Sequence, residues 1–150
     1  CGLGVEGTGW IAAPGLVVTN AHVVAGVERP RVDRGAGTRT LRARVVSFDR
    51  RNDLAVLRVV GLRGRPLPLA LAKRDVSVAL LGYPDNGPYQ ATAARLGQTV
   101  TMLGRDAYGS ISLGRDVVTI RGEVRILHAL SDTEPVATQG PVWYLEGRSV

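Results

Sequence analysis

The sequence is poor in cysteine and in aromatic residues. Its 150 residues include one cysteine, and aromatic residues make up 5%. A single cysteine cannot form a disulfide within the chain, so Cys1 is a free thiol, a lipid-modified residue or half of a disulfide whose partner lies elsewhere. The low aromatic content leaves no evident platform on which nucleic-acid bases could stack.

Long apolar runs and lysines are also missing. No stretch approaches the roughly 20 apolar residues that a membrane-spanning helix needs, and no secretory leader is visible. Because the sequence begins at Cys1 rather than Met, we expect a fragment or a processed product. The net charge is +6, but the basic residues are scattered arginines, with Lys73 the one lysine. Arg42 and Arg44 alternate with apolar residues, as on the solvent face of a strand. We therefore expect solvated arginines and no nucleic-acid partner.

Metal-ligand patterns are absent from the sequence as well. Its two histidines, His22 and His128, have no cysteine or carboxylate cluster at ligand spacing. The sequence therefore predicts no metal site and no organic cofactor.

What the sequence does contain is one informative stretch, residues 7–24. Pro14-Gly15 is turn chemistry between two apolar segments, and Leu16 to Thr19 is suited to a strand. His22 follows at the predicted strand end, between small and apolar neighbours. A rigid scaffold that presents one histidine suits general-base chemistry, although a histidine at a strand end can also be purely structural.

Two motifs in this stretch resemble the first-barrel signature of chymotrypsin-fold serine proteases. They are Gly-Thr-Gly-Trp-Ile at residues 7–11 and Thr-Asn-Ala-His-Val-Val at residues 19–24, and they are most similar to the bacterial HtrA-like and MarP-like branch. The resemblance implies an all-β, trypsin-like double Greek-key β-barrel in which His22 is the catalytic base. In MarP-like proteases a cysteine at the position of Cys1 pairs with a late cysteine, which this sequence lacks.

Asp53 is the second candidate residue. We expect a long strand over residues 38–48, in which Val45 and Val46 interrupt the alternation, as happens where a strand bends or becomes buried on both faces. A turn follows, and then Asp53 and an apolar strand. Asn-Asp-Leu-Ala-Val-Leu at residues 52–57 resembles the segment that supplies the family's triad aspartate. Its carboxylate would orient the histidine and stabilise the imidazolium. Without the resemblance, a strand-start aspartate bonded to local backbone N–H groups is the favoured interpretation.

The second half of the chain fits the same pattern as far as residue 124. Residues 61–68 read as a linker, and Val76 to Leu81 resembles the first strand of the second barrel. We expect one or two strands over residues 89–103 and another over residues 116–124. The predicted organisation is a first barrel over 1–66, an incomplete second barrel over 67–124, and an unplaced tail over 125–150.

The nucleophile of such a protease is missing. The family places it in a glycine-rich Ser loop whose backbone N–H groups form the oxyanion hole, but the sequence contains no Gly-x-Ser-Gly. Ser131 lies near the expected place with no glycine beside it and is a weak candidate. Three explanations compete: truncation or an altered reading frame after about residue 125, a divergent pseudoprotease, or an unusual loop around Ser131. We favour the first.

The resulting hypothesis is a serine endopeptidase domain that acts on polypeptides and is truncated or inactive as given. The alternative is a pseudoprotease that binds peptides or partners by strand addition; a small basic β-barrel that binds nucleic acid is a third, weaker one. The family resemblance implies an extracytoplasmic location, periplasmic or at the cell surface, and leaves a membrane-anchored parent protein open. Substrate preference and oligomeric state do not follow from the sequence.

Overall fold

The fold is built almost entirely of strands. The computed structural model describes residues 4–33, 39–83, 88–110, 114–121 and 142–148. In this part of the chain the elements are β1 (Gly4–Ala13), β2 (Leu16–Thr19), α1 (Ala21–Val24), β3 (Arg31–Asp33), β4 (Leu41–Asp49), β5 (Leu54–Val59), β6 (Ser77–Gly82), β7 (Gln90–Met102), β8 (Arg115–Arg121) and β9 (Val142–Arg148). The all-β prediction is confirmed. Within the described ranges, no helix is long and apolar enough to cross a bilayer.

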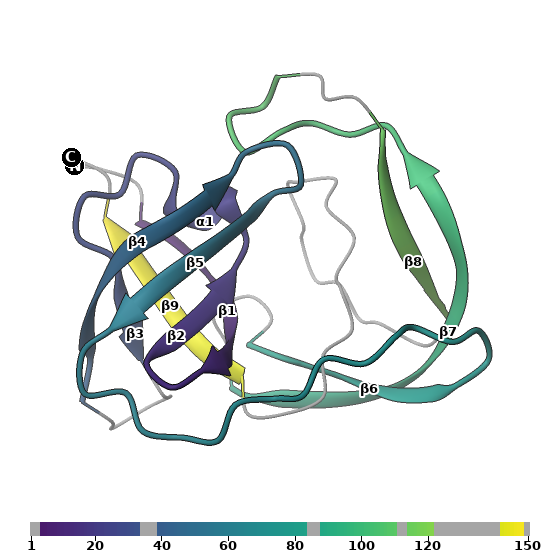
Figure 1. The fold of residues 1–150 in the computed structure, drawn as a ribbon, viewed down its shortest axis with the longest axis horizontal. Helices are drawn as coiled ribbons and strands as arrows, with labels where there is room; N and C mark the ends of the chain where they lie inside the picture. The colour runs from purple at the N-terminus through teal and green to yellow at the C-terminus, as the bar shows by residue number, and fades with distance from the viewer. Residues whose placement is uncertain (1–3, 34–38, 84–87, 111–113, 122–141, 149–150) are drawn as a thin grey trace.

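Five strands from the first half of the chain close into a barrel together with β9. Its strands follow the order β1-β2-β5-β4-β3-β9, and every neighbouring pair is antiparallel (Figure 1). Alternate residues of the strands point inward, and the largest fully buried side chains are Ile11, Val17, Val32 and Leu57. Burial of each such side chain contributes about 1.5–3 kcal/mol, so this core fixes the framework on which the candidate site is mounted.

Two local irregularities follow the sequence as predicted. Gly15 has a φ of 71° in the turn between β1 and β2, a conformation that glycine adopts without steric cost. The register between β4 and β5 shifts between Val45 and Ser47, where the sequence predicted either a bend or burial on both faces. This β-bulge increases the local twist of β4 and lets the strand curve around the barrel.

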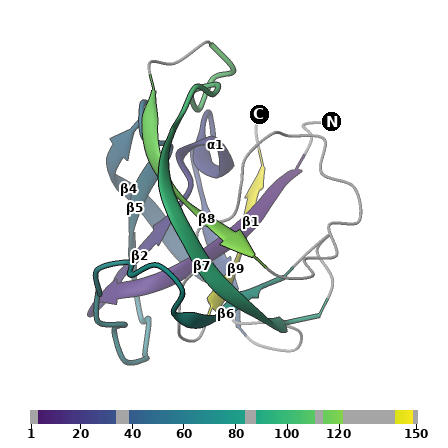
Figure 2. The same cartoon turned by 90° about the vertical axis from the view of Figure 1, so that its right-hand side faces the viewer.

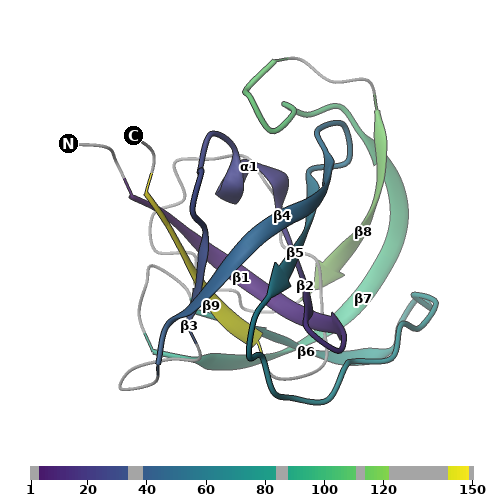
Figure 3. The ribbon, with the colours of Figure 1, turned by 60° about the vertical axis from the view of Figure 1, so that its left-hand side comes forward.

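Strand β9 lies in the segment that sequence reasoning left unplaced. It pairs with β1 on one side, with Gly7 opposite Leu145, and with β3 on the other, with Val32 opposite Leu145. Figure 3 shows β9 running between these two strands. Residues 142–148 therefore complete the first barrel, although they lie far from it in sequence.

The second unit is a sheet of three described strands in the order β6-β7-β8. Figure 2 shows β7 as a long curved strand, and β7 pairs with both β6 and β8. Residues 90–102 form one strand, which is one of the two predicted options. The linker is tied to the barrel by a bond from the Leu67 N–H to the Ile11 carbonyl, 2.9 Å. The Tyr83 N–H, just after β6, reaches Thr8 Oγ1 of β1 at 3.4 Å. The exact domain boundaries stay a prediction.

Candidate active site

His22 lies in α1, a single helical turn, and not at the end of a strand as the sequence suggested. The chain leaves β2 at Thr19, and Asn20 has extended backbone angles and no side-chain cap bond to the helix. Asp53 supplies the cap instead. Its carbonyl accepts the Ala21 N–H at 3.1 Å, and its Oδ1 accepts the His22 N–H at 2.8 Å. The first turn of a helix has N–H groups without internal partners, and here Asp53, from the turn between β4 and β5, satisfies two of them.

Asp53 sits at the end of the tight turn between β4 and β5. Its φ is 55°, a left-handed conformation that aspartate and asparagine tolerate better than most residues. The turn is held by Asp49, whose carboxylate accepts the N–H groups of Arg51 and Asn52 at 3.0 Å each. Asp53 itself is buried, with 3% of its surface exposed, so the turn places a buried carboxylate beside α1.

The two predicted residues meet in the structure. His22 Nδ1 lies 2.7 Å from Asp53 Oδ2, with 36% of the histidine side chain and 4% of the aspartate side chain exposed. An ionised carboxylate only accepts hydrogen bonds, so Nδ1 carries the proton and, in the neutral ring, Nε2 has a free lone pair. This arrangement can remove a proton from a group placed near Nε2.

Asn20 is a third member of the site that sequence reasoning did not single out. Its Nδ2 donates to Asp53 Oδ2 at 3.2 Å and to the Asp53 carbonyl at 3.3 Å. With this contact the carboxylate accepts three hydrogen bonds, two from His22 and one from Asn20. The sequence contained a signal for this role, because Asn20 lies two residues before His22 and its amide can donate a hydrogen bond.

The site keeps Asp53 ionised. Burial raises the pKa of its carboxyl, but the hydrogen bonds from His22 and Asn20, together with the charge of His22, outweigh burial and hold the pKa below its ordinary value. At neutral pH Asp53 is therefore a buried anion with its oxygens occupied, which is what a residue that orients and stabilises a histidine requires.

Gly7 sets how closely α1 approaches the barrel. A Cβ at Gly7 would lie 2.5 Å from Cγ2 of Val23, the residue after His22. Only glycine leaves room for that contact, and Val23 is 3% exposed. The absence of a side chain at Gly7 therefore lets α1, which carries His22, pack closely against β1.

Ser131, the weak nucleophile candidate, lies outside the described residues, and so does His128. In the described ranges, no three histidine, cysteine, aspartate or glutamate side chains gather as a metal site would need.

Comparison with known proteins identifies the family. A family model described as a trypsin-like peptidase domain matches residues 7–150. This chain belongs to the trypsin-like peptidase family. The serine protease Rv3671c of Mycobacterium tuberculosis is 43% identical over 123 residues, which cover 80% of this chain and 30% of that protein. This trypsin-like domain therefore spans less than a third of the length of that relative.

Solved structures agree with the family. The crystal structure of the active form of the Rv3671c protease matches this trypsin-like domain with a TM-score of 0.71 and 42% identity, over 81% of this chain and 54% of the other. The HtrA-type protease AlgW, in a structure with a decapeptide, matches with a TM-score of 0.61 over 78% of this chain and 35% of the other. At 22% identity, AlgW shows a shared fold alone. The predicted trypsin-like fold is confirmed.

Proposed function

We propose that this chain supplies the base and the orienting carboxylate of a Ser-His-Asp triad, in a domain that hydrolyses peptide bonds. The observation that carries the proposal is the 2.7 Å contact between His22 Nδ1 and a buried, ionised Asp53. Membership of the trypsin-like peptidase family supports the same roles.

In this mechanism Nε2 of His22 takes the proton of the nucleophile's hydroxyl as the oxygen attacks the peptide carbonyl. The imidazolium then gives that proton to the leaving amine. Asp53 stays ionised throughout: it holds the tautomer with Nδ1–H and stabilises the positive ring. Asn20 and the Oδ1 bond to the His22 N–H keep the carboxylate from rotating. Positioned base catalysis of this kind contributes about 10²–10⁴-fold to rate.

The nucleophile is the part that this proposal leaves open. The sequence has no Gly-x-Ser-Gly segment, and Ser131 has no glycine neighbour to build an oxyanion hole. We therefore propose that the polypeptide as given hydrolyses peptides poorly or not at all. Polypeptide substrates, an extracytoplasmic location and the boundaries 1–66 and 67–124 belong to the same proposal; they rest on the relationship to Rv3671c and on the HtrA-type neighbours.

Fluorophosphonate labelling followed by peptide mapping tests the proposal in two steps. The purified chain is labelled first, beside His22→Ala and Ser131→Ala. We expect no adduct in a folded sample. A His22-dependent adduct on Ser131 would show instead that the chain completes its own triad.

The second step supplies the missing part. Residues 125–141 are replaced by the segment of the Rv3671c protease that carries the serine replaced by alanine in one of its solved structures. Strand β9 and its pairing with β1 and β3 are kept. The chimera should react with the probe and cleave casein, and His22→Ala in the chimera should lower both rates at least about 100-fold. A folded chimera that is inert, or that reacts equally well without His22, would contradict the proposed roles.

A further inference from the structure

The loop between β7 and β8 is prefolded around one carboxylate. Within residues 105–110, Asp106 Oδ1 accepts the N–H groups of Tyr108 and Ser110 at 2.9 Å each. Backbone bonds from the Asp106 N–H to the Ser110 carbonyl, 2.8 Å, and from the Gly109 N–H to the Asp106 carbonyl, 2.9 Å, close the same loop. The loop is thus a compact unit and can act as one body. We call residues 105–110 the clasp loop.

The clasp loop docks on the first barrel although it belongs to the second sheet. The Ala107 N–H donates to the Arg50 carbonyl at 3.3 Å, and Ala107 is 8% exposed and packs in the core cluster of the first barrel. The ring of Tyr108 lies 5.9 Å from that of Phe48 in β4. Figure 1 shows this loop arching over the turn between β4 and β5.

Arg50 makes the central contact of this junction. Its Nε donates to Asp106 Oδ2, and its guanidinium lies over the Tyr108 ring, 5.4 Å from the centroid. The Asp106 side chain is 8% exposed, whereas Arg50 is half exposed. Burial raises the pKa of Asp106, but the bonds from Arg50, Tyr108 and Ser110 lower it further than burial raises it, so Asp106 is ionised at neutral pH.

The place where the clasp loop docks gives it a role at the site. Arg50 begins the turn that ends at Asp53, and Asp53 holds its left-handed φ of 55° only while that turn keeps its shape. A residue in such a conformation is held there by its surroundings. Both the carbonyl and the side chain of Arg50 are engaged by the clasp loop.

We propose that the clasp loop positions the triad aspartate, with Arg50 and Asp106 as positioning residues. This inference rests on the proposed function, because it assigns the second sheet a task in orienting Asp53 toward His22. When the clasp loop is docked, the turn holds the Asp53 carboxylate against α1. When the loop leaves, the turn relaxes and the His22–Asp53 contact loosens, so the conformation of the second sheet controls the base carried by the first barrel.

Hydrogen exchange and histidine NMR test this inference without any need for a nucleophile. The chain has two histidines, so in a ¹⁵N-histidine sample His128→Gln assigns the His22 signals. Arg50→Ala and Asp106→Asn should speed exchange of the His22 amide about three- to tenfold, the size expected for loss of a half-exposed ion pair and a cation–π contact. They should also weaken the low-field signal of the His22 Nδ1 proton. Arg50→Lys, which keeps the charge, should restore part of the protection.

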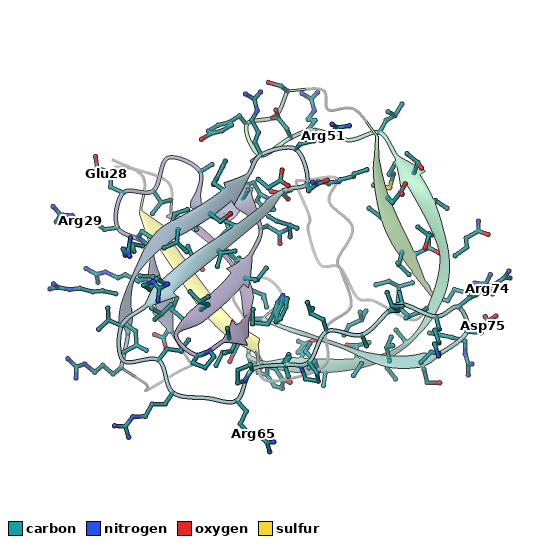
Figure 4. The ribbon with its side chains drawn as sticks, in the orientation of Figure 1. Glu28, Arg29, Arg51, Arg65, Arg74 and Asp75 are labelled. Atoms are coloured by element: carbon teal, nitrogen blue, oxygen red, sulfur yellow. The ribbon has the colours of Figure 1, made fainter. Side chains whose placement is uncertain are left out.

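The matched control is Arg51→Ala, in the same turn. The Arg51 side chain is exposed (Figure 4), and its exchange effect should stay within twofold. Amides of the barrel core should exchange at the wild-type rate in all variants. One such amide is that of Val59, which donates to the Gly15 carbonyl. This result is expected because a positioning residue acts on the site and not on the stability of the whole barrel. Equal His22 exchange in Arg50→Ala, Asp106→Asn and wild type, or uniform acceleration across the barrel, would overturn the inference. The proposed triad roles would survive either result, since they are tested by labelling of the chimera.

Discussion

Replacing Gly7 by alanine should displace the helix that carries His22. The new methyl would lie 2.5 Å from Cγ2, 3.1 Å from Cγ1 and 3.4 Å from Cβ of Val23. Non-bonded carbons settle at about 3.5–4.0 Å, so the two groups must separate by roughly 1 Å. Rotation of Val23 is costly, because a β-branched residue in a helix has one strongly preferred χ1 rotamer and this side chain is buried.

The size of the effect follows from where Val23 lies. Inserting a methyl into a packed core costs about 1–3 kcal/mol of the free energy of unfolding. His22 precedes Val23 in the same helical turn, and its Nδ1 is 2.7 Å from Asp53 Oδ2. A shift of roughly 1 Å takes that pair beyond the 3.2 Å or so at which such a hydrogen bond is effective. The variant should therefore lose stability and the His22–Asp53 contact together.

Urea unfolding followed by tryptophan fluorescence measures the first effect, and the low-field NMR signal of the His22 Nδ1 proton measures the second. Gly104→Ala is the matched control, because its new Cβ would meet only the end of the Arg115 side chain at 3.7 Å. Its stability should stay within about 0.5 kcal/mol of wild type. A Gly7→Ala protein as stable as wild type, with its low-field proton intact, would refute the reasoning.

Three further predictions concern the same framework. Asp53→Asn keeps a residue that tolerates the positive φ but removes the charge, so urea unfolding at pH 7 should show a loss of about 1–3 kcal/mol; unchanged stability would mean that the carboxylate is not needed to cap α1. Leu57→Ala opens a cavity in the barrel core and should cost about 2–5 kcal/mol, against a negligible change for Leu69→Ala, whose side chain is 84% exposed. The pKa of Asp53 is lower in the folded state than in the unfolded chain, where it is about 3.9. The charged carboxylate therefore contributes its full stabilisation above the unfolded pKa. This stabilisation is lost as the pH falls through the pKa of the folded state. Unfolding curves from pH 7 to pH 2 should therefore bring wild type and Asp53→Asn closer together in acid, and a constant difference would contradict that sign.

Local sequence signals predicted β1, β2, β4 and β5 of the first barrel, but neither β3 nor β9. Pro14-Gly15 specifies its turn through a positive φ, and the apolar run after it forms β2 with the predicted bounds. The double valine at residues 45 and 46 marked the bulge of β4. The meeting of His22 and Asp53, 31 positions apart in sequence, came from the family resemblance and not from any local pattern.

Features that depend on distant partners were not predictable in this way. Residues 21–24 form a helical turn because Asp53 caps them from the distant turn between β4 and β5, and a four-residue helix has almost no propensity of its own. Strand β9 pairs with β1 and β3 across more than a hundred residues of sequence. Arg50 reads as one of many solvated arginines until the fold brings Asp106 to it.

Figure 4 illustrates why arginines in this chain need structural context. Arg29 and Arg65 extend outward from the barrel, and Arg74 lies next to Asp75 at the far end of the second sheet. Exposed pairs such as Arg74 and Asp75 contribute little to stability, about 0–1 kcal/mol. Arg50 differs from these arginines in two ways. Its partner, Asp106, has a buried side chain, and Arg50 lies in the same turn as Asp53.

The most direct test of the account is the tautomer of His22, read from the ¹⁵N chemical shifts of its ring above the pH at which it is protonated. The account predicts a proton on Nδ1, bonded to Asp53, and a bare Nε2 that can act as a base. Asp53→Asn should disturb that preference, and Arg51→Ala should not. A ring protonated on Nε2 in the folded wild-type protein would contradict the account, because His22 could then take no proton from a nucleophile.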